Sequence, residues 1–260
     1  MKKYELTDET LKIGPITLHR VKSLVAFTGV EVGATGGWVE KEANLDQNGN
    51  AWVSDNAWVY GNAWVYGNAR VYGNARVSDN AWVSGNAWVY GDARVSGDAL
   101  VYGNARVSGD AWVYDNARVY GNARVSDNAW VYGDARVSGD ALVYDNARVS
   151  GDALVYGNAR VSGDALVYDN KHYMVIGPIG SRDDTITFTL NKKGGIFASV
   201  GCFFGTLAEF RAKVSDTHGG NVHAQAYLMA AQLAELRIDT TPISDTQEEP
   251  TERCEKGNVE

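Results

Sequence analysis

The sequence predicts a mainly β fold built around a parallel β-solenoid, and two observations support this. The hexapeptide A-x-V-y-[GD]-[ND] is repeated 20 times without insertion over residues 51–170. A period of six does not suit an α-helix, whose faces recur every 3.6 residues, but it suits a short strand followed by a corner. Three strands and three corners close one triangular coil of 18 residues. The segment therefore predicts about 6.7 coils, about 32 Å long at the usual spacing between strands.

Each position of the repeat has a predicted direction. Ala and Val lie two residues apart, so both point into the coil. Position x is Trp, Arg or Leu, and position y is Tyr or Ser, and these side chains point outward. Gly, Asp and Asn at the last two positions tolerate the backbone of a corner. The interior is therefore expected to be narrow and apolar, which leaves the outer faces and the ends for function.

This pattern resembles the hexapeptide-repeat family, whose fold is the left-handed parallel β-helix. The family's inward aliphatic and inward small residues match in all 20 repeats, which make up 120 of the 260 residues. Many members are trimeric acyltransferases that bind acetyl-CoA or an acyl carrier between subunits. They usually need a His base and a loop that interrupts the coils. The four His residues here lie outside the repeats, so the resemblance in fold does not carry the activity with it.

Residues 18 apart are expected to stack, so the outer faces carry ladders of aromatic and Arg side chains. Such ladders stabilise neighbouring coils. The alternative is a binding surface for a base, a sugar or a protein, with Trp112, Trp130, Arg118 and Arg136 as candidates. The repeats hold 9 Arg and 13 Asp, and this negative balance disfavours nucleic acid. Exposed Trp on several faces predicts a homodimer or homotrimer.

Residues 1–50 are predicted to cap the solenoid, because an exposed solenoid end is an unpaired strand edge. Residues 16–27 (ITLHRVKSLVAF) alternate enough for a pair of strands. Trp38-Val39 is expected to begin an imperfect first coil. The segment that leads into the repeats contains GGW-V-E, then N-L, then G-N-A-W-V. It resembles the start of hexapeptide-repeat proteins of bacteria and their phages.

Residues 171–238 predict a small α+β unit of order ββαα. DTITFTL (184–190) and GIFASVGCF (195–203) are the predicted strands, joined by a hairpin with Gly at its turn. The string IGSRDDTITF…GCFFGTLAEFRAKVSDTHGGN…AQAYL resembles a C-terminal module of phage and prophage proteins, over about 60 residues. The resemblance implies a phage setting rather than a reaction.

Two helices are predicted to complete this unit. Thr206 and Glu209 form a capping box at the start of the first helix. Asn221 can cap a second helix that runs to about Arg237. The side chains expected inside are Leu207, Phe210 and Val214 in the first helix, and Tyr227, Leu228, Ala231, Leu233 and Leu236 in the second.

The C-terminal unit also holds the chain's one cluster of chemically active side chains. Weak catalytic candidates are Cys202, His218 and His223, and candidate binding residues are Arg182, Asp183, Asp184, Thr217 and His218. A Cys nucleophile with a His base is conceivable chemistry, but Cys202 ends an apolar strand, where inert buried Cys residues lie. A zinc site would lack a fourth ligand and paired spacing. No metal and no cofactor are therefore predicted.

Charge and composition narrow the remaining classes. The net charge of −8 divides into −1 for residues 1–50, −4 for the repeats, +2 for 171–238 and −5 for 239–260. Residues 239–260 predict a disordered acidic tail, with Cys254 incidental. No run of 18 apolar residues is present, which argues against a membrane protein. Two Cys and an N-terminus without an apolar stretch favour the cytoplasm.

The leading hypothesis is a non-enzymatic, rigid β-solenoid scaffold or binding protein of phage or prophage type. It would present its C-terminal unit, or its aromatic and Arg faces, to a protein partner or a small anionic ligand. A host-directed inhibitor that acts in the host cytoplasm belongs to this class. The alternative is an acyltransferase that uses acetyl-CoA at a subunit interface.

Overall fold

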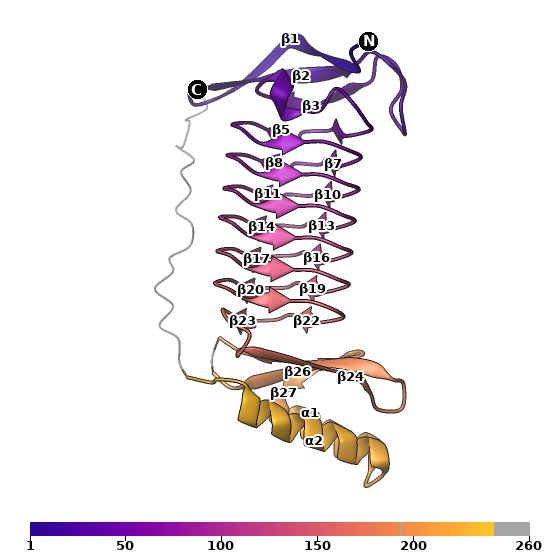
Figure 1. Cartoon of the computed structure of the whole chain (residues 1–260), viewed down its shortest axis with the longest axis vertical. Helices are drawn as coiled ribbons and strands as arrows, with labels where there is room; N and C mark the ends of the chain where they lie inside the picture. Colours follow the sequence, from indigo (N-terminus) through magenta and orange to yellow (C-terminus); the bar gives the residue numbers. More distant parts are fainter. Residues whose placement is uncertain (193, 242–260) are drawn as a thin grey trace.

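The computed structural model describes residues 1–192 and 194–241 and has three parts stacked along one axis (Figure 1). Antiparallel strands lie at the N-terminal end, and a parallel β-solenoid of about seven turns forms the middle. An antiparallel sheet with two helices lies at the other end. The mainly β solenoid fold is therefore confirmed. The predicted tail at 239–260, with Cys254, lies outside the described residues except for 239–241.

Each hexapeptide forms one two-residue strand at its x and Val positions, followed by a turn. The strands are β4 (Trp52–Val53), β5 (Trp58–Val59), β6 (Trp64–Val65), β7 (Arg70–Val71), β8 (Arg76–Val77), β9 (Trp82–Val83), β10 (Trp88–Val89), β11 (Arg94–Val95), β12 (Leu100–Val101), β13 (Arg106–Val107), β14 (Trp112–Val113), β15 (Arg118–Val119), β16 (Arg124–Val125), β17 (Trp130–Val131), β18 (Arg136–Val137), β19 (Leu142–Val143), β20 (Arg148–Val149), β21 (Leu154–Val155), β22 (Arg160–Val161) and β23 (Leu166–Val167). Strands 18 residues apart pair in parallel, so that Trp88 lies opposite Arg106. They form a seven-stranded sheet, a six-stranded sheet, and a ten-stranded sheet that includes the N-terminal strands.

The interior of the solenoid consists of the Ala and Val side chains of the repeats, all of which are buried. Main-chain hydrogen bonds join each coil to the next: the Arg106 N–H donates to Ala123 O at 2.9 Å and the Ser108 N–H to Val125 O at 3.0 Å. The narrow apolar interior that the repeat predicts is therefore confirmed.

The fifth position of the repeat turns the corner with a left-handed backbone, and Asp takes this position as well as Gly. Asp55 and Asp79 have φ of 56° and 58°. Their side chains also bind the next coil, because the Gly73 N–H donates to Asp55 Oδ2 at 3.0 Å and the Gly97 N–H donates to Asp79 Oδ2 at 3.1 Å. This inter-coil hydrogen bond compensates for the strain of a non-Gly residue in this conformation.

The sixth position forms ladders of side-chain amides along the corners. Asn68 Nδ2 donates to Asn86 Oδ1 at 3.1 Å, Asn86 donates to Asn104 at 3.1 Å, and Asn104 donates to Asn122 at 3.0 Å. Asn122 then donates to Asp140 Oδ1 at 2.9 Å. An ionised Asp has no hydrogen to donate, so the amide ladder ends at that residue.

The N-terminal strands are β1 (Tyr4–Ile13), β2 (Ile16–Ser23) and β3 (Thr35–Val39), followed by the short 3₁₀ helix η1 (Glu42–Asn44). The pair of strands predicted over residues 16–27 is wrong, because this segment supplies only β2 and its hairpin partner is β1. The prediction for Trp38-Val39 is confirmed, since these residues pair in parallel with Trp58 and Val59. β3 therefore continues the solenoid sheet by one strand.

Two adjacent glycines in β3 allow this strand to lie against the first coil. A Cβ on Gly36 would lie 2.6 Å from Val53 O and 2.3 Å from Val21 Cγ2. A Cβ on Gly37 would lie 2.7 Å from Ala57 O. All three distances are too short for real atoms, so only Gly permits the close approach of this strand to the solenoid end.

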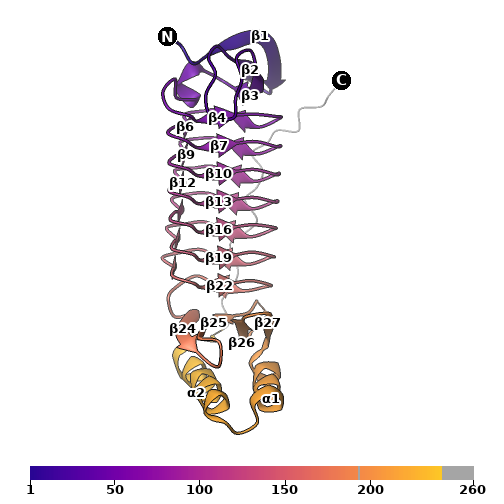
Figure 2. The same ribbon diagram turned by 90° about the vertical axis from the view of Figure 1, so that its right-hand side faces the viewer.

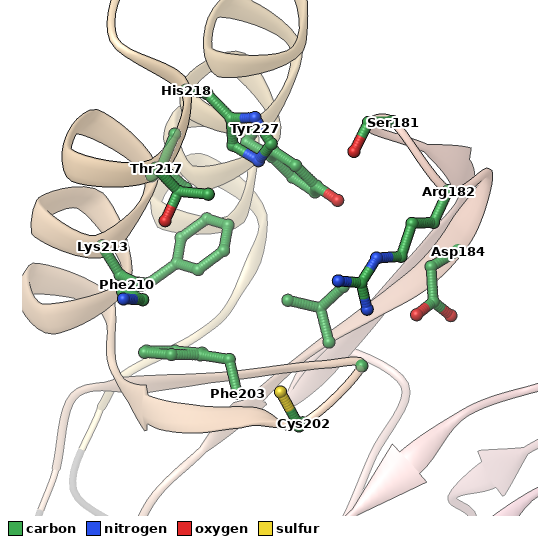
Figure 3. Close-up of a pocket in the computed structure, with 13 residues that line it drawn as sticks. Ser181, Arg182, Asp184, Cys202, Phe203, Phe210, Lys213, Thr217, His218 and Tyr227 are labelled. Atoms are coloured by element: carbon green, nitrogen blue, oxygen red, sulfur yellow. The ribbon is translucent and has the colours of Figure 1, made fainter.

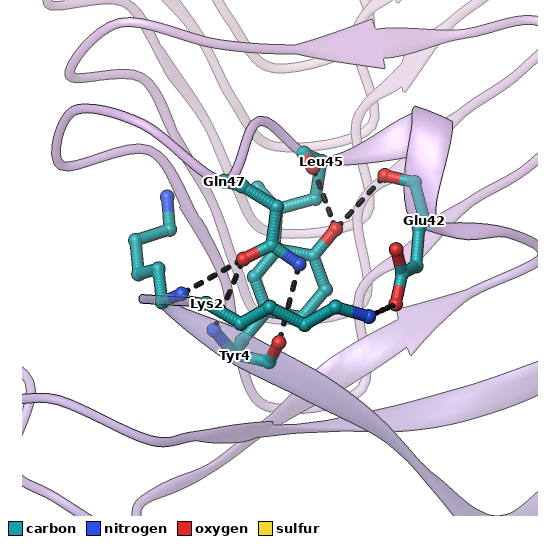
Figure 4. A network of polar contacts seen from close by, with 6 residues as sticks. Lys2, Tyr4, Glu42, Leu45 and Gln47 are labelled. Atoms are coloured by element: carbon teal, nitrogen blue, oxygen red, sulfur yellow. Dashed lines mark hydrogen bonds and ion pairs between the residues drawn. The ribbon is translucent and has the colours of Figure 1, made fainter.

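A buried polar network joins the N-terminus to the residues that enter the solenoid (Figure 4). The Tyr4 hydroxyl donates to Leu45 O at 2.6 Å and contacts Glu42 O at 2.9 Å, while Gln47 Oε1 accepts from the Lys3 N–H at 2.8 Å. The Lys3 ammonium donates to Ala51 O at 2.9 Å. Burial lowers the pKa of Lys3 to about 8 and raises the pKa of Tyr4.

These pKa shifts predict how stability depends on pH. Between about pH 8 and 10, the free energy of unfolding is expected to rise, because folded Lys3 has lost a proton that the unfolded chain still holds. Above about pH 10 the trend is expected to reverse, because unfolded Tyr4 ionises while folded Tyr4 stays protonated. Denaturant titrations across this range measure the effect. A Lys3→Met variant should lack the rise, and a rise that persists in it would contradict the assignment to Lys3.

The C-terminal unit has a four-stranded antiparallel sheet in the order β24 (Tyr173–Ile179), β25 (Asp184–Leu190), β26 (Ile196–Val200) and β27 (Phe203–Thr206). The predicted α+β character is confirmed, but the strand number in the ββαα order is wrong. Residues 173–179 form a strand that was not expected, and GIFASVGCF is split by a turn at Gly201-Cys202. The predicted hairpin between β25 and β26 is confirmed.

The helices α1 (Leu207–His218) and α2 (Val222–Arg237) lie side by side on the face of the sheet remote from the solenoid (Figure 2). The Thr206–Glu209 capping box and the Asn221 cap are both present, as predicted. The interior side of α2 is only partly as expected, because Leu233 and Leu236 are 50% and 87% exposed. The small side chains of α2 face α1 and the sheet instead: Ala224, Ala230, Ala231 and Ala234 are buried beside Tyr227.

The last coil of the solenoid is covered by this sheet. The Arg160 N–H donates to Thr187 Oγ1 at 2.9 Å, the Lys192 N–H donates to Asp164 O at 2.9 Å, and the Tyr173 hydroxyl donates to Leu154 O. These contacts satisfy backbone groups that have no further coil to pair with. Within residues 1–192 and 194–241, no helix has the length and apolar character needed to cross a membrane.

Candidate functional site

A cavity of about 260 Å³ opens in the C-terminal unit between the sheet and the two helices (Figure 3). Four parts of the chain form its walls. The turn from β24 to β25 and the turn from β26 to β27 form one side, and α1 with Tyr227 of α2 forms the other. The lining residues are Ser181, Arg182, Asp184, Val200, Gly201, Cys202, Phe203, Phe210, Lys213, Val214, Thr217, His218 and Tyr227.

Aromatic rings form the apolar part of the wall. The ring centroids of Phe203 and Phe210 are 5.7 Å apart, and those of Phe210 and Tyr227 are 5.8 Å apart at an interplanar angle of 90°. The His218 ring lies 5.7 Å from that of Tyr227. These contacts hold the rings in fixed orientations, with edge-to-face geometry at Phe210 and Tyr227. The capping box of α1 orients the helix that carries Phe210, so local sequence sets the position of this wall.

Two cations and one carboxylate lie at the edges of the cavity. Figure 3 shows the Arg182 side chain extending into it, opposite Lys213. The Lys213 ammonium lies 3.6 Å from Asp216 Oδ2. Asp184 Oδ1 accepts a hydrogen bond from the Thr185 N–H at 2.8 Å, and its carboxylate is directed away from the aromatic side chains. The charged side chains that face the cavity are therefore mainly hydrogen-bond donors.

Tyr227 is held tightly at the back of the cavity. A Cβ on Gly180 would lie 2.0 Å from the Tyr227 hydroxyl oxygen, so a Gly is needed at that position, where φ is +77°. Burial raises the pKa of Tyr227, the nearby Asp184 carboxylate raises it further, and Arg182 opposes the shift. The phenol consequently stays protonated at neutral pH, and its hydroxyl donates to Ile179 O at 3.5 Å.

The cavity brings together five of the seven site residues predicted in the C-terminal unit. Arg182, Asp184, Cys202, Thr217 and His218 all line it. The other two predicted residues do not. Asp183 lies in the turn between β24 and β25 with φ of +49°, and the His223 ring lies 6.1 Å from that of His218 without reaching the wall.

The expectation that Cys202 is buried at the end of a strand is wrong. Cys202 is exposed in the two-residue turn between β26 and β27, because the chain must reverse there to pair the two strands. Figure 3 places Cys202 beside Phe203. His218 lies on the opposite side of the cavity, next to Tyr227. This is not the geometry of a nucleophile and its base. Among the described residues, no group of three or more His, Cys, Asp or Glu side chains could hold a metal ion.

Sequence reasoning missed the aromatic side of this cavity and its second cation. Phe203, Phe210 and Tyr227 were expected only as strand or core residues, and Lys213 was not singled out. The one available signal was the spacing of Phe210, Lys213 and Thr217 along α1, which puts them on neighbouring positions of one helix face.

The four candidate residues on the solenoid do not form one site. Trp112 and Trp130 stack at 5.5 Å on one sheet, whereas Arg118 and Arg136 pair with each other on another. The exposed tryptophan faces are also partly covered, since Arg94 lies 4.6 Å from the Trp112 ring. The same arrangement recurs at three further pairs: Arg76 over Trp58, Arg106 over Trp88 and Arg148 over Trp130. These ladders stabilise the coils by cation–π contact.

Comparison with known proteins addresses the solenoid alone. Residues 63–115 and 117–169 match, in overlapping segments, a family model described as the YdcK beta solenoid repeat. No curated protein matches the chain. The matched segments lie within the coils of β6 to β23 and stop short of the C-terminal cavity. Over these segments the solenoid is therefore similar to the YdcK β-solenoid repeat family.

Proposed function

We propose that this protein is a non-enzymatic binding protein in which the solenoid is a rigid spacer and the C-terminal cavity is the binding site. The observation that carries the proposal is the convergence of Arg182, Lys213 and three aromatic rings on one cavity. The solenoid is a weaker candidate for the binding site, because its interior is filled with Ala and Val and many of its outer rings pair with one another. The partner is a protein or a small anionic ligand.

The setting of this function is part of the proposal. The resemblance of the C-terminal sequence to phage and prophage modules supports a phage-encoded protein that acts in the host cytoplasm, for example as a host-directed inhibitor. Assembly into a homodimer or homotrimer is a further expectation. Trp64 and Trp82, on neighbouring strands of one sheet, are 37% and 45% exposed and would supply the apolar contact surface.

The alternative, an acyltransferase that uses acetyl-CoA at a subunit interface, has less support. All four His residues lie outside the repeats, and the coils run from β4 to β23 without an inserted loop. Acetyl-CoA turnover that is lost in a His218→Ala or His223→Ala variant would favour the enzyme and overturn the proposal.

Shortening the solenoid by one coil tests the spacer role. Deleting residues 87–104 removes exactly one set of three strands, so Arg70 would stack on Arg106 and every inward Ala and Val would stay inward. The variant is expected to fold and to retain the same compounds from a bacterial extract as the full chain. Its length should fall by about 5 Å, the distance between neighbouring strands, which small-angle X-ray scattering measures. Deleting residues 87–101 instead breaks the six-residue register and should prevent folding.

A cavity variant provides the complementary measurement. Val200 is half-buried and lines the cavity, so the Phe side chain in Val200→Phe should fill part of the cavity. The variant should then no longer retain compounds from the bacterial extract. Retention that survives Val200→Phe but disappears with the coil deletion would assign binding to the solenoid faces and overturn the proposal.

A further inference from the structure

The polar groups around the C-terminal cavity are unbalanced in favour of donors. The Arg182 guanidinium and the Lys213 ammonium can only donate, whereas the hydroxyl groups of Ser181 and Thr217 can donate or accept. The Tyr227 hydroxyl already donates to Ile179 O. The one carboxylate of the lining, Asp184, already accepts a backbone hydrogen bond and turns away from the rings. A ligand that satisfies this wall must carry acceptors, and an anionic group satisfies it best because charge-assisted hydrogen bonds are the strongest.

The apolar wall sets a second requirement. Phe203 is half-buried and Phe210 and Tyr227 are buried beside it, and these rings line the side of the cavity opposite the turn that carries Arg182. Such a wall favours a planar ring in edge-to-face or offset contact. The volume of about 260 Å³ lies just below the range of roughly 300–1,000 Å³ found for drug-sized ligands. One ring with one anionic substituent fits this volume.

We infer that the cavity binds a small organic anion with one planar ring, with the ring against Phe203, Phe210 and Tyr227 and the anionic group on Arg182. This inference rests on the proposed function and names its ligand class. Arg182 is the main anion contact because its planar guanidinium forms paired hydrogen bonds with a phosphate or carboxylate. Lys213 makes the smaller contribution, because Asp216 lies 3.6 Å from its ammonium.

The turn between β26 and β27 is held in place by the solenoid. Arg160 of the last coil donates from a guanidinium nitrogen to Gly201 O at 2.8 Å, and Gly201 lines the cavity beside Cys202. The same Arg160 donates its backbone N–H to Thr187 in the sheet. This bracing gives the site the preorganisation that a small ligand needs. The binding test therefore uses the full chain.

Isothermal titration of the full chain with three probes tests the ligand class. Phenyl phosphate carries both the ring and the anion, whereas inorganic phosphate carries only the anion and benzyl alcohol only the ring. Phenyl phosphate is expected to bind at least about tenfold more tightly than either half, because both contacts are then made. Equal affinity for phenyl phosphate and inorganic phosphate would overturn the inference.

Three variants separate the contacts. Arg182→Gln should weaken phenyl phosphate about tenfold or more and change benzyl alcohol by less than about twofold. Lys213→Gln should weaken phenyl phosphate by only a few-fold, and Arg182→Lys should restore part of the loss. Arg182 is exposed in a turn, so its variants should keep the thermal midpoint of the wild type. Unchanged phenyl phosphate binding by folded Arg182→Gln would overturn the assignment of the anion contact.

The two levels of the proposal fail in different ways. If Val200→Phe abolishes retention from the extract while phenyl phosphate does not bind, the cavity is the binding site and the ligand class is wrong. If phenyl phosphate binds equally well to wild type and Val200→Phe, the cavity is not the binding site, and both proposals are overturned.

Discussion

A Val125→Asp substitution is expected to prevent the solenoid from folding under conditions in which the wild-type chain is stable. Val125 is fully buried in β16, surrounded by Ala and Val side chains that offer a carboxylate neither a donor nor a counter-ion. Burying an unpaired neutral polar group costs about 2–7 kcal/mol, and an unpaired charge costs more. Small domains are stabilised by about 5–15 kcal/mol in total. Loss of the β signal in far-UV circular dichroism measures the effect.

The matched control changes the neighbouring residue to the same side chain. Arg124 lies in the same strand but is exposed, and it pairs in register with Arg106. In Arg124→Asp the carboxylate stays in water beside an Arg, so the free energy of unfolding should change by less than about 0.5 kcal/mol. Similar losses in both variants would show that the two residues do not face opposite sides of the coil.

A Gly36→Ala substitution is expected to destabilise the N-terminal end of the solenoid. The added methyl group would lie 2.3 Å from Val21 Cγ2, 2.6 Å from Val53 O and 2.7 Å from Trp52 Cζ2. The carbonyl belongs to the first coil and cannot move without disturbing its strand. Overpacking of this kind costs about 1–3 kcal/mol, and a backbone contact adds to the cost. A lower thermal midpoint, with earlier hydrogen exchange in β3 and β4, measures it.

Gly220→Ala is the control for the loss of a glycine. Nothing lies within 4 Å of a Cβ at Gly220, and its backbone is not left-handed. The thermal midpoint should therefore match that of the wild type. If Gly36→Ala also left the midpoint unchanged, β3 could not pack against the first coil as closely as the structure shows.

The solenoid was the most predictable part of the chain, because one periodicity determined several features together. The six-residue period gave the direction of each side chain, the 18-residue stacking and the position of every corner. Trp38-Val39 was recognised as an incomplete repeat and does pair with Trp58-Val59. What the period did not show was the role of the corner Asp, whose carboxylate accepts a hydrogen bond from the next coil.

The ends of the chain were less predictable, because their elements are defined by partners distant in sequence. β1 was missed, since its alternation is interrupted by charged residues and its pairing with β2 contains a bulge. Leu233 and Leu236 were expected inside α2, but the approach of α1 and the sheet leaves room for Ala at the contact. Hydrophobicity alone predicts that Leu rather than Ala is buried, whereas the short distance between α2 and its neighbours places Ala at the buried positions.

The candidate site was less predictable than the solenoid but more predictable than the ends of the chain. Arg182, Asp184, Cys202, Thr217 and His218 were named from their chemistry and their proximity in the sequence, and the structure places all five on one cavity. The aromatic wall could not be foreseen. An apolar residue in a predicted strand or helix is expected in a core, and only the gap between α1 and the β26–β27 turn places Phe203 and Phe210 in the wall of a cavity.

The sequence by itself determined the period, the inward Ala and Val, the register of the coils and the helix caps, because each depends on residues close together in the chain or repeated along it. The tertiary structure decided how the ends are covered, which face of α2 is buried and where a cavity forms. Those features depend on how closely separate elements approach one another. Such distances are set by side-chain volumes on both partners, as at Gly36 against the first coil and Gly180 against Tyr227, and a single strand or helix does not contain that information.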